Sequence, residues 1–325
     1  MSGPTLVDVC SGAGGLVLGL EQAGFEPRLL LDDDEAAVTT LRTNRPQWNV
    51  LHTDLLDFDP AEHPVSHDVD LLSAGLPRVK SSATVGRADS QAEERLLKAA
   101  VYLVHAIRPR AVVIENVPGL AESDEYHPFR DFAHAELAHL GYEFSWFVLN
   151  AVDFGVPQNR RQGVLVAVER QRAEAFRQPL PTVEEPLTVG AALEASMASR
   201  GWKDAARWAA QADRPAPTLV GGSRNRGGAD LGPSGAKNTW ATMGVNAHTV
   251  GDVIPDPDFE WNPELGRDGM VKLTVEQAAL LQSFPETWEI TGLKTARYRQ
   301  VGQATPPPVG RALGRSVLAA LNGKG

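Results

Sequence analysis

Glycine and aspartate residues near the start of the chain have the types and spacing of a nucleotide-binding site. The segment VDVCSGAGGLVLGLEQAGF reads as a strand, a glycine-rich turn with Gly12, Gly14 and Gly15, and a helix. Glycines in such a turn permit tight backbone geometry and let a ligand approach the N–H groups that open the helix. Asp32 lies about twenty positions further on, at the end of the next strand, where a ribose hydroxyl is usually held.

Asp54 ends the third apolar stretch, VLHTD, and its carboxylate could accept a hydrogen bond from an adenine amino group. Taken singly, each of these features has a plainer interpretation. The turn fits any nucleotide-binding fold, and an aspartate at a strand end is more often simply solvated. The elements around these residues therefore decide how they are interpreted.

Short apolar runs alternate with helical patterns through the first 170 residues. The predicted strands are rich in Val, Leu and Ile: TLVDVC, RLLLD, VDLLSAG, AVVIENV and GVLVAVE. The predicted helices span 15–23, 35–44, 90–107 and 127–140, where the apolar spacing follows the helical period. This alternation predicts an α/β fold with a mostly parallel sheet that is covered on both faces.

Beyond residue 170 the alternation stops. Residues 219–270 are rich in Gly, Asn, Asp and Pro and read as long loops, which in a compact protein are usually functional or disordered. Helical periodicity returns at LTVEQAALLQSF and again at VGRALGRSVLAAL. The sequence thus predicts one domain from 1–170 together with 294–325, and a smaller domain over 171–293.

Charge, apolar runs and cysteine content exclude several classes of protein. No apolar run approaches the roughly 20 residues that span a bilayer, and the first residues do not resemble a signal peptide, so we expect a cytoplasmic protein without a membrane partner. The single cysteine, Cys10, excludes an internal disulfide framework and a cysteine-based metal cluster. The net charge is -10, but residues 294–315 hold five basic residues and no acid, which allows a DNA-binding face there.

Five segments in order along the chain carry a specific resemblance. They are VDVCSGAGG, AGLPRVKSS, IENVPGL, FGVPQNRRQGVLVAV and YRQVGQATPPPVGRALG, and they span almost the whole chain. In this order and spacing they resemble the motifs of DNA cytosine-5 methyltransferases. The resemblance implies a Rossmann-like S-adenosylmethionine-dependent methyltransferase domain, a smaller target-recognition domain, and double-stranded DNA bound in the cleft between them.

The resemblance also assigns residues to each site. S-adenosylmethionine, or its product S-adenosylhomocysteine, would lie against Asp8, Cys10, Gly12, Gly14, Gly15, Asp32, Asp54, Leu55 and Pro77. In the family a target cytosine is flipped out of the duplex, a cysteine thiolate adds to its carbon 6, and carbon 5 then takes the methyl group. The base pocket and its chemistry map onto Glu115, Asn116, Arg160, and Arg78 at the position of that cysteine.

Arg78 is the main departure from the family, because it follows Pro77 where the family has its cysteine nucleophile. A guanidinium stays protonated and has no lone pair for attack, so the usual thiolate mechanism is unavailable. Further departures from the family pattern are Val79, Lys80, Ser81, Gln162 and Gln303, unless Arg161 substitutes for Gln162 by a register shift. Several base-pocket positions differ together while the cofactor motifs are intact. We therefore expect natural divergence of the chemistry with retention of cofactor binding.

Replacement nucleophiles are weak candidates. Cys10 lies in the cofactor turn, where a small buried apolar residue is the favoured interpretation. Lys80 and Ser82 lie in the right loop, but each needs activation by a base, and no histidine stands in that motif.

Three functions remain open from the sequence. The first is a methyltransferase that acts on DNA or a related pyrimidine without a cysteine adduct. The second is a non-catalytic protein that uses DNA and cofactor binding to regulate or scaffold. The third is a transferase whose substrate is not nucleic acid, which would suit the acidic net charge.

Overall fold

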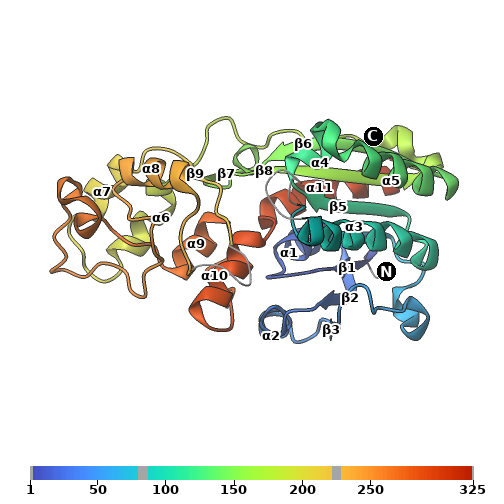
Figure 1. Cartoon of the computed structure of the whole chain (residues 1–325), viewed down its shortest axis with the longest axis horizontal. Coiled ribbons are helices and arrows are strands. Elements are labelled where there is room, and N and C mark those ends of the chain that lie inside the picture. Colours follow the sequence, from blue (N-terminus) through green and yellow to red (C-terminus); the bar gives the residue numbers. More distant parts are fainter. Residues whose placement is uncertain (1–2, 80–86, 222–227, 324–325) are drawn as a thin grey trace. The chain divides into compact units, whose positions relative to one another are not determined.

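The computed structural model describes residues 3–79, 87–221 and 228–323, and the chain divides into two compact units (Figure 1). The first unit comprises Met1–Leu149, Arg161–Leu180 and Val309–Gly325, and the second comprises Asn150–Arg160 and Pro181–Pro308. This division differs from the expected boundaries at 150–160 and 294–308, which belong to the second unit, and at 171–180, which belong to the first. In the second unit, α10 (Lys294–Gln303) packs against α9 (Val275–Leu281), a contact that helical periodicity alone does not reveal.

A seven-stranded sheet in the order β3-β2-β1-β4-β5-β8-β6 forms the centre of the first unit. Its strands are β1 (Thr5–Val9), β2 (Glu26–Asp32), β3 (Val50–His52), β4 (Leu71–Gly75), β5 (Ala111–Asn116), β6 (Tyr142–Asn150) and β8 (Arg161–Glu169). The pairs among β1 to β5 are parallel, whereas β8 is antiparallel to β5. The predicted α/β fold with a mostly parallel sheet is confirmed. Sequence analysis missed β6, an edge strand in which apolar and polar residues alternate over 142–145 before an apolar run over 146–149.

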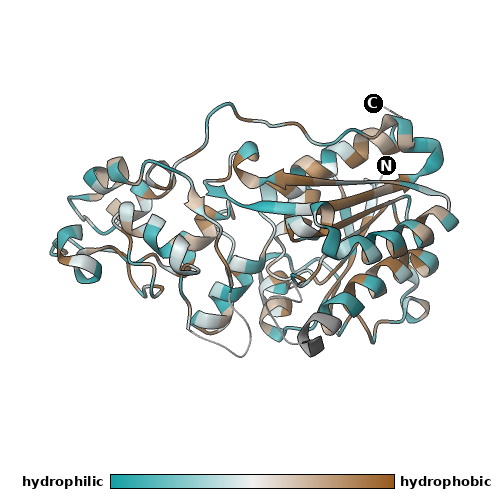
Figure 2. Ribbon diagram, turned by 45° about the horizontal axis from the view of Figure 1, so that its top comes forward, coloured by the Kyte–Doolittle hydropathy of each residue, from teal (hydrophilic) through white to brown (hydrophobic). Residues whose placement is uncertain are grey.

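Both faces of this sheet are buried, as the continuous apolar runs predict. All six residues of β5 are buried, and Figure 2 shows the strands as the most hydrophobic part of the unit. One core cluster joins Val7 and Val9 of β1 with Leu97, Val101 and Val104 on the long helix α3. The helices of the unit are α1 (Gly15–Ala23), α2 (Glu35–Asn44), α3 (Arg87–Ile107), α4 (Pro118–Glu122), α5 (His127–His139) and α11 (Pro307–Leu321).

The terminal helix α11 returns to the first unit and packs against α1 at very short range. A Cβ added to Gly310 would lie 2.7 Å from the Leu16 carbonyl oxygen. One turn further along, a Cβ added to Gly314 would lie 2.7 Å from the Ala23 Cβ. The two glycines therefore allow the backbones of α11 and α1 to approach each other.

The second unit is mainly helical and is built around buried tryptophans. Trp208 and Trp240 are fully buried, and Trp202 and Trp261 are also buried. Its helices are α6 (Val189–Ala198), α7 (Ala205–Gln211), α8 (Ser234–Thr242), α9 and α10, with a short parallel pair of β7 (Gln158–Asn159) and β9 (Ala216–Pro217). Among the helices of the described residues, none is both long and apolar enough to cross a membrane.

The close contact of α11 with α1 makes a testable prediction. Gly310→Ala should lower the free energy of unfolding by about 1–3 kcal/mol, because the new methyl group clashes with backbone. Helix propensity alone would act in the opposite direction by about 1 kcal/mol. Urea unfolding followed by tryptophan fluorescence measures the change. Gly235→Ala in α8 is the control, because an added Cβ there meets no atom within 4 Å. A Gly310→Ala protein as stable as the wild type would contradict the packing.

Candidate functional site

The glycine turn predicted from the sequence lies between β1 and α1 and bends sharply. Cys10, Gly12 and Gly14 have φ values of 55°, 53° and 84°, in the left-handed region. Gly14 caps the amino terminus of α1, and the Ser11 N–H donates to the Leu31 carbonyl at 3.1 Å. The turn therefore lies at the carboxyl edge of the sheet, where α/β proteins usually bind ligands, and a Cβ added to Gly12 would meet no atom within 4 Å.

Asp32 ends β2 and holds this turn in place. Its Oδ2 accepts a hydrogen bond from the Gly12 N–H at 2.7 Å, and its Oδ1 accepts one from the Asp34 N–H at 2.9 Å. Burial raises the pKa of Asp32 to about 6, although these two hydrogen bonds oppose the shift. Asp32, the residue predicted to bind the ribose, thus also orders the glycine turn.

Asp8, on β1, is fully buried beneath the same turn. The Ser73 hydroxyl donates a short hydrogen bond to its Oδ1, while its Oδ2 has no hydrogen-bond partner among the described residues. Burial raises the pKa of Asp8 to about 7, against the lowering effect of hydrogen bonds from Ser11 and Ser73. Sequence analysis did not single out Ser73, whose only signal is a hydroxyl within the otherwise apolar strand LLSAG.

Asp54 and Leu55 follow β3 and differ in exposure. Asp54 is exposed and its Oδ1 accepts a hydrogen bond from the Leu56 N–H at 2.8 Å, whereas Leu55 is buried in the core of the unit. A carboxylate beside an apolar side chain has the chemistry needed to face an adenine ring and its amino group. The arrangement is compatible with the predicted adenine contact.

Asn116, at the end of β5, binds the loop that follows β4. Its Oδ1 accepts hydrogen bonds from the N–H groups of Val79 (3.0 Å) and Val117 (2.9 Å), and its Nδ2 donates to the carbonyls of Leu76 (3.4 Å) and Pro77 (3.1 Å). One buried amide therefore fixes the loop on both sides of residue 78.

Arg78 lies half-buried in this loop, in the electrostatic field of buried Glu115. Burial lowers the pKa of Arg78 from its ordinary value, and Glu115 opposes that shift. Gly75 of β4 is paired with Glu115 of β5, so the loop starts beside this carboxylate. The structure thus brings Arg78, Glu115 and Asn116 together. Lys80, Ser81 and Ser82, which the sequence places in the same loop, lie outside the described residues.

The environment of Cys10 does not favour a thiolate. Burial raises the pKa of its thiol well above the ordinary value, and the carboxylates of Asp32, Asp8, Asp33 and Asp54 raise it further. A nucleophilic cysteine requires the opposite, an electropositive setting that lowers the pKa. The structure therefore agrees with the interpretation of Cys10 as a small residue packed against the core.

Arg160 is fully buried in the second unit, where it binds backbone. Its Nη1 donates to the carbonyls of Leu219 and Gly302, both at 3.0 Å, and its Nη2 donates to the carbonyl of Gln303 at 3.2 Å. Nearby, the Gln158 side chain accepts from the Leu219 N–H at 2.8 Å. The predicted base-pocket arginine therefore has a structural role that the sequence motif did not indicate.

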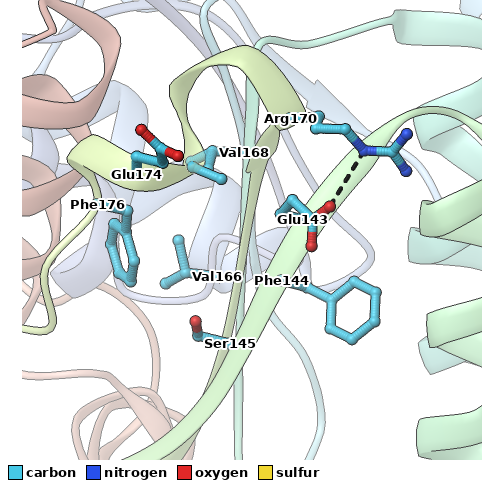
Figure 3. Close-up of a pocket in the computed structure, with 9 residues that line it drawn as sticks. Glu143, Phe144, Ser145, Val166, Val168, Arg170, Glu174 and Phe176 are labelled. Carbon is cyan, nitrogen blue, oxygen red and sulfur yellow. Dashed lines mark hydrogen bonds and ion pairs between the residues drawn. The ribbon is translucent and has the colours of Figure 1, made fainter.

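A shallow pocket of about 470 Å³ lies away from these residues (Figure 3). It is lined by residues of β6, by the end of β8 and by 170–176, and Arg170 donates to Glu143 at its edge at 3.1 Å. Val168 in its wall is paired with Ala111, the first residue of β5. The pocket is thus at the amino end of the parallel strands, whereas Asp8, Asp32 and Glu115 lie toward the carboxyl end.

The hydrogen bonds of Arg160 make a second prediction. Arg160→Ala should lower the free energy of unfolding by about 3 kcal/mol, because three buried carbonyls lose their donor. The neighbouring Arg161→Ala is a matched control: its side chain is 53% exposed, and its ion pair with Glu122 should contribute less than about 1 kcal/mol. Urea unfolding of both variants measures the difference. Equal decreases in the free energy of unfolding for the two variants would show that the buried guanidinium is not structurally important.

Comparison with known proteins agrees with this arrangement. The family model described as C-5 cytosine-specific DNA methylase matches residues 5–319. The Type II methyltransferase M.NaeI of Lentzea aerocolonigenes is 42% identical over 98% of this chain and 76% of its own length. The Type II methyltransferase M.NgoMIV of Neisseria gonorrhoeae is 34% identical over 98% of both chains.

Two solved structures share the fold at low sequence identity. The S. pombe Dnmt2 methyltransferase matches with a TM-score of 0.65 and 16% identity, over 98% of this chain and 99% of its own. The Entamoeba histolytica methyltransferase EhMeth matches with a TM-score of 0.68 and 13% identity, over 99% of both chains. The fold is the Rossmann-like methyltransferase fold, and the chain belongs to the C-5 cytosine-specific DNA methylase family.

Proposed function

We propose that this protein binds S-adenosylmethionine and double-stranded DNA but does not methylate cytosine carbon 5 through a cysteine adduct. The observation that carries the proposal is Arg78, half-buried in a loop held by Asn116 and facing the field of Glu115. A protonated guanidinium has no electron pair to add to carbon 6. The base pocket therefore holds a cation where the family reaction needs a thiolate.

The residues around the glycine turn fit the cofactor. Gly12 has positive φ, and a Cβ added there would enter open space, so the turn leaves room for a ligand beside its backbone. Asp32 would hold the ribose hydroxyls and Asp54 the adenine amino group, with Leu55 and Pro77 as apolar neighbours. When bound, S-adenosylmethionine supplies an electrophilic methyl group on a sulfonium. The remaining assigned residues, Asp8, Cys10, Gly14 and Gly15, would complete the same cradle.

Fewer basic side chains are available to bind DNA phosphates than the sequence suggests. Residues 294–315 contain no acid, yet Lys294 lies 2.9 Å from Asp252, and Arg297 pairs with Glu276. Within the Gly-rich region, Lys237 lies 2.8 Å from Asp230. These pairs neutralise part of the expected basic face, so a duplex would release fewer counterions than the residue count implies. Support for DNA binding rests mainly on membership of a DNA methylase family.

A non-catalytic role in DNA binding is favoured over a replacement mechanism. Cys10 is the only thiol in the chain, and its pKa is raised rather than lowered. The second candidate is a transferase whose acceptor is not nucleic acid, which the net charge of -10 favours. If the protein showed no salt-dependent affinity for duplex DNA, that result would support the second candidate.

The third prediction concerns the wild-type protein. With tritiated S-adenosylmethionine and mixed duplex DNA, it should bind the cofactor and the duplex but leave cytosine carbon 5 unlabelled, because no thiolate forms. Scintillation counting of hydrolysed DNA, beside a cofactor titration, measures both properties. Labelled 5-methylcytosine would show that the family reaction proceeds without its cysteine.

The fourth prediction concerns reversal. Arg78→Cys should not restore full cytosine-5 activity, because Ser81, Gln162 and Gln303 also depart from the family pattern. The same labelling assay measures this, with the wild-type protein as the reference. Robust duplex methylation by Arg78→Cys alone would contradict a broadly altered pocket.

A further inference from the structure

A buried amide in the second unit holds two exposed basic residues close together. The Oδ1 of Asn246 accepts a hydrogen bond from the His248 N–H, and its Nδ2 donates one to the Arg267 carbonyl, both at 3.1 Å. Asn246 itself is buried, whereas His248 and Arg267 are exposed. One side chain therefore fixes the backbone of both basic residues at the same place on the surface.

Backbone hydrogen bonds hold the segment around His248 from two sides. The Leu231 N–H donates to the Ala247 carbonyl at 3.0 Å, and the Asn246 N–H donates to the Val271 carbonyl at 2.8 Å. His248 is thus presented to solvent from a backbone that is anchored on both sides. Such a fixed position favours a defined contact with a ligand, because little backbone freedom is lost when the contact forms.

Arg267 differs from the other exposed arginines of the second unit. Its side chain makes no ion pair or hydrogen bond with any residue that the structure describes. The other exposed arginines of this unit in the described ranges each have a partner: Arg200, Arg207 and Arg214. A guanidinium carries five donors and no acceptor, and two of these donors can bind two oxygens of one phosphate. Arg267 is therefore available to bind an anion.

The charges around His248 also favour an anion. Its strongest charged neighbours are the cations Arg267 and Lys237, the latter on α8, and the carboxylate Asp230. Asp230 is already paired with Lys237, at 2.8 Å. The remaining charged residues on the segments around His248 have smaller effects on it; they are Asp252, which pairs with Lys294, and Glu264, Asp268 and Lys272.

We propose that Arg267 and His248 together contact one phosphate group of bound DNA, and that His248 takes up a proton from solvent when this contact forms. This inference rests on the proposed DNA binding and gives it a place on the second unit. In the free protein the Arg267 and Lys237 cations disfavour an imidazolium at His248. A phosphate beside the ring favours it, so the ring gains one proton and one positive charge on binding. Affinity for the duplex should therefore increase as the pH falls.

Fluorescence anisotropy of the full chain with labelled duplexes of unrelated sequence tests the part of Arg267. Arg267→Ala should weaken binding to all duplexes alike and should reduce the slope of log K against log salt concentration by about 0.9, the contribution of one phosphate contact. Arg214→Ala is the matched control, because Arg214 is exposed in the same unit but lies 2.9 Å from Asp213, and it should keep the wild-type slope. An unchanged slope for Arg267→Ala, or a loss confined to one sequence, would overturn the phosphate contact.

A pH series tests the part of His248. The ratio of wild-type to His248→Gln affinity should rise by about fivefold or more from pH 7.5 to pH 5.5, because only the imidazolium neutralises a phosphate. His139→Gln, at an exposed position at the end of α5, should keep the wild-type pH dependence. A ratio that stays constant would overturn this inference alone. No salt-dependent duplex binding by the wild type would overturn the proposed DNA binding and this inference with it.

Discussion

The amide of Asn116 is the interaction on which the candidate site depends. It uses both its donors and its acceptor on backbone groups of residues 76–79 and on Val117. Because these partners lie up to 40 positions away, one side chain joins the ends of β4 and β5. Whatever residue occupies position 78 is consequently held beside Glu115. In this chain that residue is Arg78, whose guanidinium lies in the electrostatic field of Glu115.

Parallel strands impose a second constraint, because their carboxyl ends meet at one edge of the sheet. Asp8, Asp32 and Asp54 come from three strands and would repel one another if all were ionised. Burial raises the pKa of Asp8 to about 7 and of Asp32 to about 6, so part of the repulsion is avoided by protonation near neutral pH. Both groups destabilise the fold as pH rises through these values, since the folded state holds its protons more tightly than the unfolded state. Such strain is typical of ligand sites.

The second unit shows that a catalytic-looking motif can also be a packing motif. Gln158 and Arg160 are both fully buried and hydrogen-bonded to segments at Leu219 and 301–304, with Gln282 linking the same region. These residues would be needed for the fold even in a protein without turnover. The match of QNR to the family pattern therefore supports membership of the family more strongly than it supports activity.

The sequence by itself determined the alternating strands and helices, the glycine turn, the helices at 15–23 and 35–44, and the presence of arginine at position 78. These features depend on local backbone preferences and on periodic burial, which neighbouring residues specify. Only the tertiary structure decided the partners of Asn116, the burial of Arg160, and the ion pairs of Lys294 and Arg297. It also placed 294–308 with the second unit. In each case the deciding contact joins residues far apart in the chain. Sequence periodicity reports local backbone structure and burial, so it does not predict a hydrogen bond or ion pair between such residues.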